Sequence, residues 1–263
     1  MNEQRFHTPL PLELSIGIPA GTISVETIDG DESFVTVDGN EKLVAQTIVE
    51  QRGERLVVEF QGKRGLFGIS IAVGDFSIGG GGLRVRARVP HGTAVRMKSA
   101  SGDATLRGRF ASLDSKMVSG DLLVTGEIEG HAVLKTISGD VHLDPVGGDV
   151  RIQSVSGNAG FRSVGGSLVA KSVSGDLHVE SIRAGHVEAT SISGDIEVGI
   201  AAGSSVDVDA SSVSGDLSSG VPLADAPDAS VGGPVVVVRG KTVSGDFKIS
   251  RAATPSASPV AAG

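Results

Sequence analysis

Apolar and polar residues alternate over short stretches of the second half of the chain, and the pattern recurs mostly every 18 or 19 residues. Each repeat carries the tripeptide Ser-Gly-Asp or a close variant, with its glycine at 102, 120, 139, 157, 175, 194, 215 and 245. Apolar residues stand two before, two after and mostly four after these glycines, as Val173, Leu177 and Val179 do around Gly175. Period-two alternation is typical of strands, so each repeat is predicted to contain strands.

Stacking of such repeats in register predicts a β-solenoid. A weaker echo half a period away, such as "PVGGDVRI" (145–152), divides each coil into two strand-sized halves. Strands of successive coils then pair in parallel at ~4.8 Å, and columns of Val, Ile and Leu, Val173 included, fill the interior. The predicted fold class is all-β: a parallel β-solenoid of 18–19-residue coils, right-handed by the usual rule for parallel crossovers.

Three regions are predicted along the chain. Residues 93–250 hold about eight SGD coils, and the last of them, "KTVSGDFKIS" (241–250), is expected to form an open end. Residues 1–92 are expected to form a β-rich cap continuous with the solenoid. In this cap "GTISVETIDGD" (21–31) resembles one more coil, and 43–60 is predicted to form two strands. Residues 251–263, rich in Pro, Ala and Ser, are predicted to be a disordered tail.

The SGD tripeptide is predicted to be a corner, because Gly adopts positive φ and Ser and Asp side chains bond nearby backbone. Stacking places the corners in one column: Gly102, Asp103, Gly120, Asp121, Gly139, Asp140, Gly175, Asp176, Gly194, Asp195, Gly215, Asp216, Gly245 and Asp246. Carboxylates ~5 Å apart repel by roughly 1–3 kcal/mol, so a partner is expected. The candidates are lysines five residues before the aspartates: Lys98, Lys116, Lys135, Lys171 and Lys241. One coil carries Asn158 with Gln153 instead. A bound cation is the alternative.

Composition excludes several kinds of function. The chain has no Cys, Trp or Tyr, which excludes thiol catalysis, Cys-based zinc sites and most aromatic stacking. A net charge of −8 argues against nucleic acid. No signal pattern and no apolar run of ~18 residues is present, so no direct membrane insertion and a cytoplasmic location are expected. No nucleophile stands beside a base, so the expectation is no catalytic residue, metal site or cofactor, and no enzyme.

The segment "RVRARVPHGTAVRMKSASGDATLRG" (84–108), followed by serial "SGDLHV"-type units, resembles a bacterial β-strand-repeat family catalogued as "putative adhesin" and also called the toast-rack domain. The likeness covers roughly residues 10–250 and depends on a strand, a Pro-x-Gly turn at 90–92, and SGD coils. The resemblance implies a family of uncharacterised function in which some members are joined to membrane segments, and these associations suggest a role in envelope-stress systems. It supplies no catalytic residues.

These patterns favour a non-enzymatic scaffold or protein-interaction module, linked to envelope-stress systems, that binds a protein partner through long flat faces or through its ends. An adhesin-like carbohydrate or cell-envelope binding protein is one alternative, and a structural protein that assembles end to end is another. A monomer or a small homo-oligomer is expected. Arg84, Arg86 and Arg88 share one strand face, either as a solvated surface or as a basic contact strip.

Overall fold

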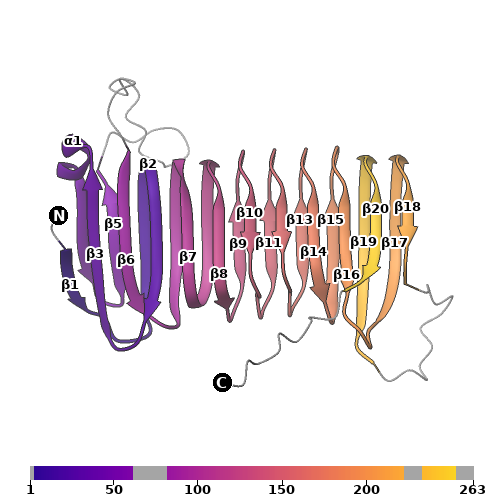
Figure 1. Ribbon diagram of the computed structural model, residues 1–263, viewed down its shortest axis with the longest axis horizontal. Helices are drawn as coiled ribbons and strands as arrows, with labels where there is room; N and C mark the ends of the chain where they lie inside the picture. The colour runs from indigo at the N-terminus through magenta and orange to yellow at the C-terminus, as the bar shows by residue number, and fades with distance from the viewer. Residues whose placement is uncertain (1–2, 62–81, 222–232, 253–263) are drawn as a thin grey trace, which may run out of the picture.

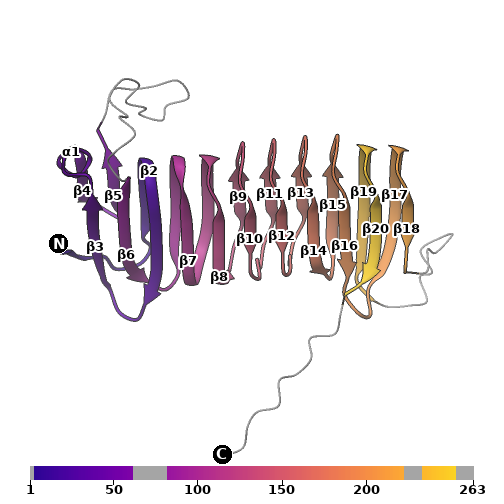
Figure 2. The same ribbon diagram turned by 45° about the horizontal axis from the view of Figure 1, so that its top comes forward.

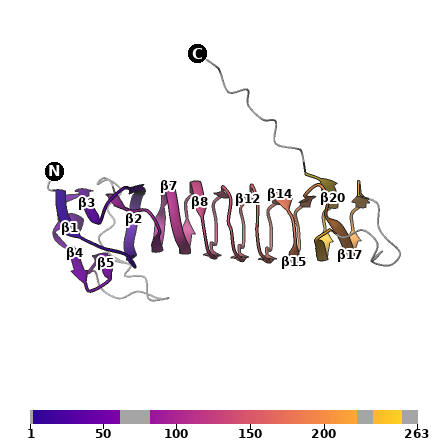
Figure 3. The same cartoon turned by 90° about the horizontal axis from the view of Figure 1, so that it is seen from below.

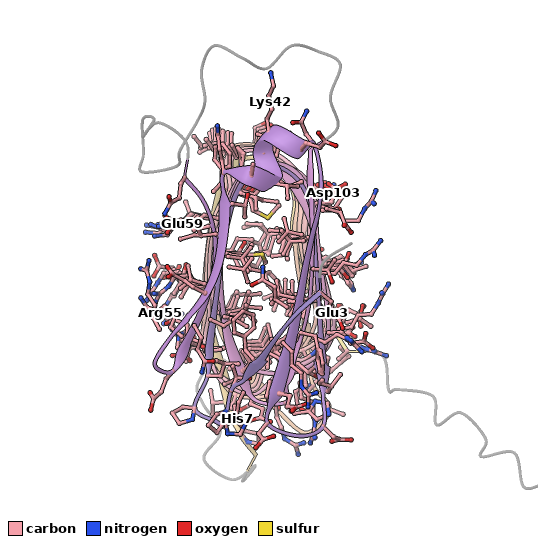
Figure 4. The ribbon with its side chains drawn as sticks, turned by 90° about the vertical axis from the view of Figure 1, so that its left-hand side faces the viewer. Glu3, His7, Lys42, Arg55, Glu59 and Asp103 are labelled. Atoms are coloured by element: carbon pink, nitrogen blue, oxygen red, sulfur yellow. The ribbon has the colours of Figure 1, made fainter. Side chains whose placement is uncertain are left out.

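Equivalent residues of successive repeats lie side by side in the structure, a computed structural model that describes residues 3–61, 82–221 and 233–252. Leu122, Val141 and Ala159, for example, are consecutive partners on three parallel strands. Stacked coils form a flattened cylinder with two facing strand layers, and the apolar side chains fill the space between them (Figures 3 and 4). The predicted all-β parallel solenoid is therefore confirmed, while its handedness stays a prediction.

The two layers share long strands that bend round the corners. In order from the N-terminal end of the stack, the first layer contains β4 (Thr47–Arg52), β5 (Arg55–Phe60), parts of β2 (Glu13–Ile28) and β7 (Thr93–Ser119), β9 (Ala132–Lys135), β11 (Val150–Gln153), β13 (Leu168–Lys171), β15 (Gly185–Thr190), β19 (Val235–Ser244) and β17 (Ser205–Ser214).

The second layer follows the same order. It contains β1 (Glu3–His7), β3 (Glu32–Gly39), β6 (Leu83–Pro90), the remaining parts of β2 and β7, β8 (Leu122–Ile128), β10 (Val141–Leu143), β12 (Ala159–Phe161), β14 (Leu177–Ile182), β16 (Ile196–Ile200), β20 (Phe247–Arg251) and β18 (Leu217–Ser219). Figure 2 shows these strands stacked along one long axis.

Of the three apolar positions that flank each glycine, the two that follow it fill the interior, and the one two residues before it does not. Leu177 and Val179 on β14 are 7% and 0% exposed, whereas Val173 is 44% exposed. The expectation that Val173 fills the interior is wrong. The alternation of inward and outward side chains continues into the corner. The hydroxyl residue immediately before Val173 in the sequence therefore points inward, and Val173 points outward. At this corner the core therefore lacks one of the three apolar columns that the repeat pattern predicts, the column that contains Val173.

At the N-terminal end, β2 is the first full coil, because it pairs in parallel with β7 and aligns Gly21 with Gly102. Beyond it the pairing becomes antiparallel, with β3 against β6, β1 against β3 and β4 against β5. The helix α1 (Glu41–Ala45) lies across this end (Figure 4), and Leu43 and Val44 pack against the core. The predicted strand from 43 thus begins only at Thr47.

The C-terminal end is not formed by the last coil in sequence. Strands β19 and β20 lie between the β15/β16 coil and the β17/β18 coil, so the chain returns to fill a position that it first passed (Figure 1). The predicted open end at 241–250 is therefore wrong. Polarity explains the order: β20 buries Phe247 and Ile249, whereas the corresponding residues of β18 are Leu217 and Ser219. The more apolar coil takes the interior position, where burial is complete.

Replacement of Phe247 by Ala tests this order. Because Phe247 is 2% exposed and covered by coils on both sides, we expect the free energy of unfolding to fall by about 3–5 kcal/mol. The matched change Leu217→Ala, at the same register in the outermost coil, should lower it by less than about 1 kcal/mol. Urea unfolding of both variants measures the difference. Equal losses would contradict the stacking order.

Candidate functional site

The SGD corners of successive coils stack directly on one another, and two separate constraints require glycine there. Gly175 has φ of 120°, in the left-handed region that side chains rarely adopt. In addition, a Cβ atom at Gly175 would overlap the carbonyl oxygen of Gly157 in the preceding coil. The same overlap recurs at Gly139, Gly194, Gly215 and Gly245. Gly102 lies in the bent strand β7 and meets Gly21 in the same way.

The aspartates beside these glycines form a continuous hydrogen-bonded column. In each coil the aspartate Oδ1 accepts from the backbone N–H of the residue at the same position in the next coil, at 2.8–3.0 Å. The column runs through Asp103, Asp121, Asp140, Asn158, Asp176, Asp195, Asp246 and Asp216, in spatial order. A carboxylate that accepts a backbone N–H makes a strong, charge-assisted bond. This bond offsets the repulsion between neighbouring carboxylates.

Asn158 shows what the column requires. Its Oδ1 accepts from the N–H of Asp176 at 2.9 Å, as an aspartate oxygen would. An acceptor at this position is therefore enough, and a negative charge is not needed. Within residues 3–61, 82–221 and 233–252, no ion pair joins Lys98, Lys116, Lys135, Lys171 or Lys241 to this column. These lysines form a separate row on the outside of the first layer, with Lys135 one coil beyond Lys116.

Between the lysine row and the aspartate column lies a row of exposed aliphatic side chains. We call it the aliphatic ridge; it consists of Val118, which is half-buried, and the exposed residues Ile137, Val155, Val173, Ile192, Val243 and Val213. From Ile137 to Val243 the exposed fractions are 44–52%, and Val213 at the end of the stack reaches 83%. At strand spacing of ~4.8 Å, the ridge is roughly 30 Å long. Exposed apolar residues are ordinary when scattered, but a contiguous row is typical of an interaction surface.

Buried hydroxyl groups lie directly beneath the ridge. Ser191 and Thr242 are 3% and 4% exposed, and neither hydroxyl oxygen has a hydrogen-bond partner among the described residues. Ser154 Oγ, one of the groups lining a small internal cavity at the same corner, is likewise unpaired within that part of the chain. The sequence carries a signal for this row, a Ser or Thr three residues before the glycine in most coils, but turn chemistry alone does not show that it points inward.

The outer face of the second layer carries a charged group that spans three coils. Glu197 on β16 accepts from Lys248 on β20 at 2.8 Å and lies 3.3 Å from the His178 ring on β14. The hydrogen bond from Lys248 holds the pKa of Glu197 below its usual range, with smaller contributions from the charges of Lys248 and His178. His142 lies two coils from His178 with Gly160 between them, as their common register predicts.

The three arginines of β6 lie on the outside of the N-terminal cap. Arg88 forms an ion pair with Glu3 at 3.0 Å and stacks over Phe34 at 4.6 Å from the ring centroid. Arg84 lies opposite Asp38 on β3. Arg86 and Arg88 line an open groove of about 410 Å³ with Glu3 and Glu26. Acidic and basic side chains alternate here, so the face is a mixed-charge surface and not a basic strip.

Within the ranges that the structure describes, no cluster of three or more His, Asp or Glu side chains is arranged to hold a metal ion. No helix in those ranges is both long and apolar enough to cross a membrane.

Arg251, the first residue of the predicted tail, ends β20, and 253–263 lie outside the described residues.

Comparison with known families gives a match over most of the chain. The model described as Toastrack DUF4097 matches residues 13–250. No curated protein matches the chain.

Solved structures with a similar course of the chain share little sequence with it. A "putative adhesin" from Bacteroides fragilis is 15% identical, with 94% of this chain and 96% of that chain covered and a TM-score of 0.48. A "putative adhesin" from Parabacteroides distasonis is also 15% identical, with the same coverage and a TM-score of 0.38. A "putative lipid binding protein" from the same organism is 13% identical over 94% and 96%, with a TM-score of 0.28. At these TM-scores the likenesses carry no argument about this chain.

Substitution of Gly175 by Ala separates the two constraints at the corner. Gly30 also has positive φ, at 101°, but open space surrounds it. We expect Gly30→Ala to lower the free energy of unfolding by about 1–2 kcal/mol through backbone strain alone. Gly175→Ala should lower it by a further 1–3 kcal/mol or so, because the neighbouring coil must shift. Thermal and urea unfolding compare the two, and equal losses would show that the close approach is unimportant.

Substitution of Asp195 tests the hydrogen-bonded column. Asp195→Asn keeps the oxygen that accepts from Asp246 and removes repulsion from two neighbouring carboxylates. We therefore expect unchanged or slightly higher stability. Asp195→Ala leaves the N–H without its acceptor and should lower the free energy of unfolding by about 1 kcal/mol. If the asparagine variant is as unstable as the alanine variant, negative charge and not hydrogen bonding maintains the column.

Proposed function

The chain belongs to the Toastrack DUF4097 family. We propose that it acts as a non-enzymatic scaffold that binds a protein partner along the row of stacked SGD corners. The aliphatic ridge carries this proposal. It is straight, contiguous and exposed, and it lies on a rigid stack of backbone hydrogen bonds, for example Ser156 N to Ile137 O at 2.8 Å. A preorganised surface loses little conformational entropy on binding.

Charge on either side of the ridge defines the partner. Lysines such as Lys135 and Lys171 flank one side, and the aspartate column, with Asp140 and Asp176, flanks the other. A complementary protein segment has apolar side chains in its middle, acidic residues facing the lysines and basic residues facing the aspartates. Such complementarity sets the orientation and the rate of association. A role in envelope-stress systems, as the toast-rack resemblance implies, and a cytoplasmic location are parts of the same proposal.

The adhesin alternative has less support. It rests on the names of solved structures that are at most 15% identical to this chain. Carbohydrate sites use aromatic rings to stack on sugars, and the chain has no Trp or Tyr. We therefore place the partner among proteins.

The ridge is tested with a pair of matched double variants. Val155→Asp with Val173→Asp places two charges on the ridge without burying them, so the fold should persist. Leu123→Asp with Val235→Asp is the control, because these side chains are almost equally exposed but lie outside the ridge. We expect a partner captured by the wild-type chain from its native cell to be lost with the ridge variant, by ~100-fold in affinity, and kept with the control.

Two readouts make this experiment decisive. Circular dichroism and thermal unfolding should show both double variants folded like the wild type. Equal capture by all three proteins would contradict binding along the ridge. Loss of capture with the control alone would place the contact on the flat faces instead.

A further inference from the structure

The stack ends in a coil whose outer edge is open. Strand β17 pairs with β19, and β18 pairs with β20; neither has a second neighbour among the described residues. Within the part of the chain that the structure describes, one side of this ten-residue strand presents backbone N–H and C=O groups with no strand beside them. Edges of this length are sites for addition of another strand.

The exposed fractions of side chains at the same register in successive coils show how much surface a further coil would cover. Leu217 is 52% exposed, although the residues at the same register in the two preceding coils, Phe247 and Ile196, are each 2% exposed. Val213 shows the same excess over the rest of the aliphatic ridge. This end therefore offers what a further coil would need: an open backbone edge, an interior position at Leu217 and a corner position at Val213.

The opposite end does not offer a complementary surface. There α1 lies at one edge and bridges the two layers, and the outermost strands β1 and β4 run antiparallel to their neighbours (Figure 4). Head-to-tail addition would place β17 beside these short antiparallel strands and the helix. A second copy of the same open end is the better complement, because it offers two strand edges at the same separation.

We propose that two copies of the chain join through β17 and β18 into a closed, two-fold symmetric dimer. The two-fold axis is perpendicular both to the long axis of the stack and to the two strand layers. It places β17 antiparallel to β17 of the second copy, and β18 antiparallel to β18. Both layers then continue across the junction. A single peptide strand would extend only one layer. Because each chain has one open end, the assembly stops at two copies. This contact is separate from the ridge binding proposed above.

Alternation and charge select the register of the β17 pair. Inward-facing residues must stand opposite inward-facing residues, so the two-fold axis passes through a residue and not between residues. An axis at Asp209 or Val208 would set carboxylates directly opposite carboxylates. An axis at Ala210 sets Asp207 opposite Val213 and Asp209 opposite Ser211. Arg239 also neutralises both aspartates within each copy, at 3.3 and 3.9 Å.

Sedimentation velocity of the full chain over a wide concentration range tests the dimer. We expect a species of twice the 26.6 kDa chain mass. Leu217→Lys places an ammonium group in the contact and should weaken the dimer by ~100-fold or more. Leu123→Lys is the matched control, an exposed leucine on the outer face of the second layer, and should leave the dimer intact. Circular dichroism verifies that both variants are folded.

A single cysteine tests the register, since the chain has none of its own. Ala210→Cys stands opposite itself across the proposed axis, so oxidation should give a covalent dimer in high yield. Val173→Cys, exposed in the middle of the stack, controls for random oxidation and should stay monomeric under the same conditions. A wild-type chain that is monomeric at all concentrations would overturn the proposal. So would a mass that grows beyond two copies, a Leu217→Lys variant that still dimerises, or equal crosslinking of the two cysteine variants.

Discussion

The close stacking of glycine on glycine at the SGD corner is the constraint on which the rest of the structure depends. A corner of one coil lies so near the carbonyl of the preceding corner that no Cβ atom fits between them. This contact fixes the register of every coil against the next, because a slip by one residue would place a side chain in that space and reverse the faces of both strands. The aspartate column reinforces the register, since each Oδ1 accepts from the N–H of the following coil.

Because the register is fixed, equivalent residues of successive coils line up in columns of similar side chains. Inside, the columns are apolar and closely packed; outside, they become the aliphatic ridge, the lysine row and alternating charges such as the Glu197–Lys248 pair. Each coil contacts only its neighbours, so the stability of a solenoid is built up locally. The surface that results is long, straight and rigid. Such a surface suits binding along a line better than enclosure of a substrate, which is why the proposed function is a scaffold.

A solenoid must end somewhere, and the two ends of this one differ. At the N-terminal end the chain changes to antiparallel pairing and places α1 at one edge, where Leu43 and Val44 pack against the core. At the other end the chain reverses the order of its last two coils, so that Phe247 is buried and the more polar coil with Leu217 faces outward. This order lowers the apolar area left in water at the open end without removing the unpaired strand edge. The edge is then available for a second copy.

Glycine spacing and alternation were enough to predict the class of fold, the parallel stacking and the position of the corners, because both act through local backbone geometry. The sequence also located the aspartate column, although the lysine row that it suggested as a partner forms no ion pair with the column among the described residues. Tertiary structure alone decided three matters. The direction of Val173 depends on how the chain bends at the corner; the acceptor role of Asn158 depends on the backbone of the next coil. The order of the last two coils depends on a competition for burial between segments 30 residues apart, which no local pattern records.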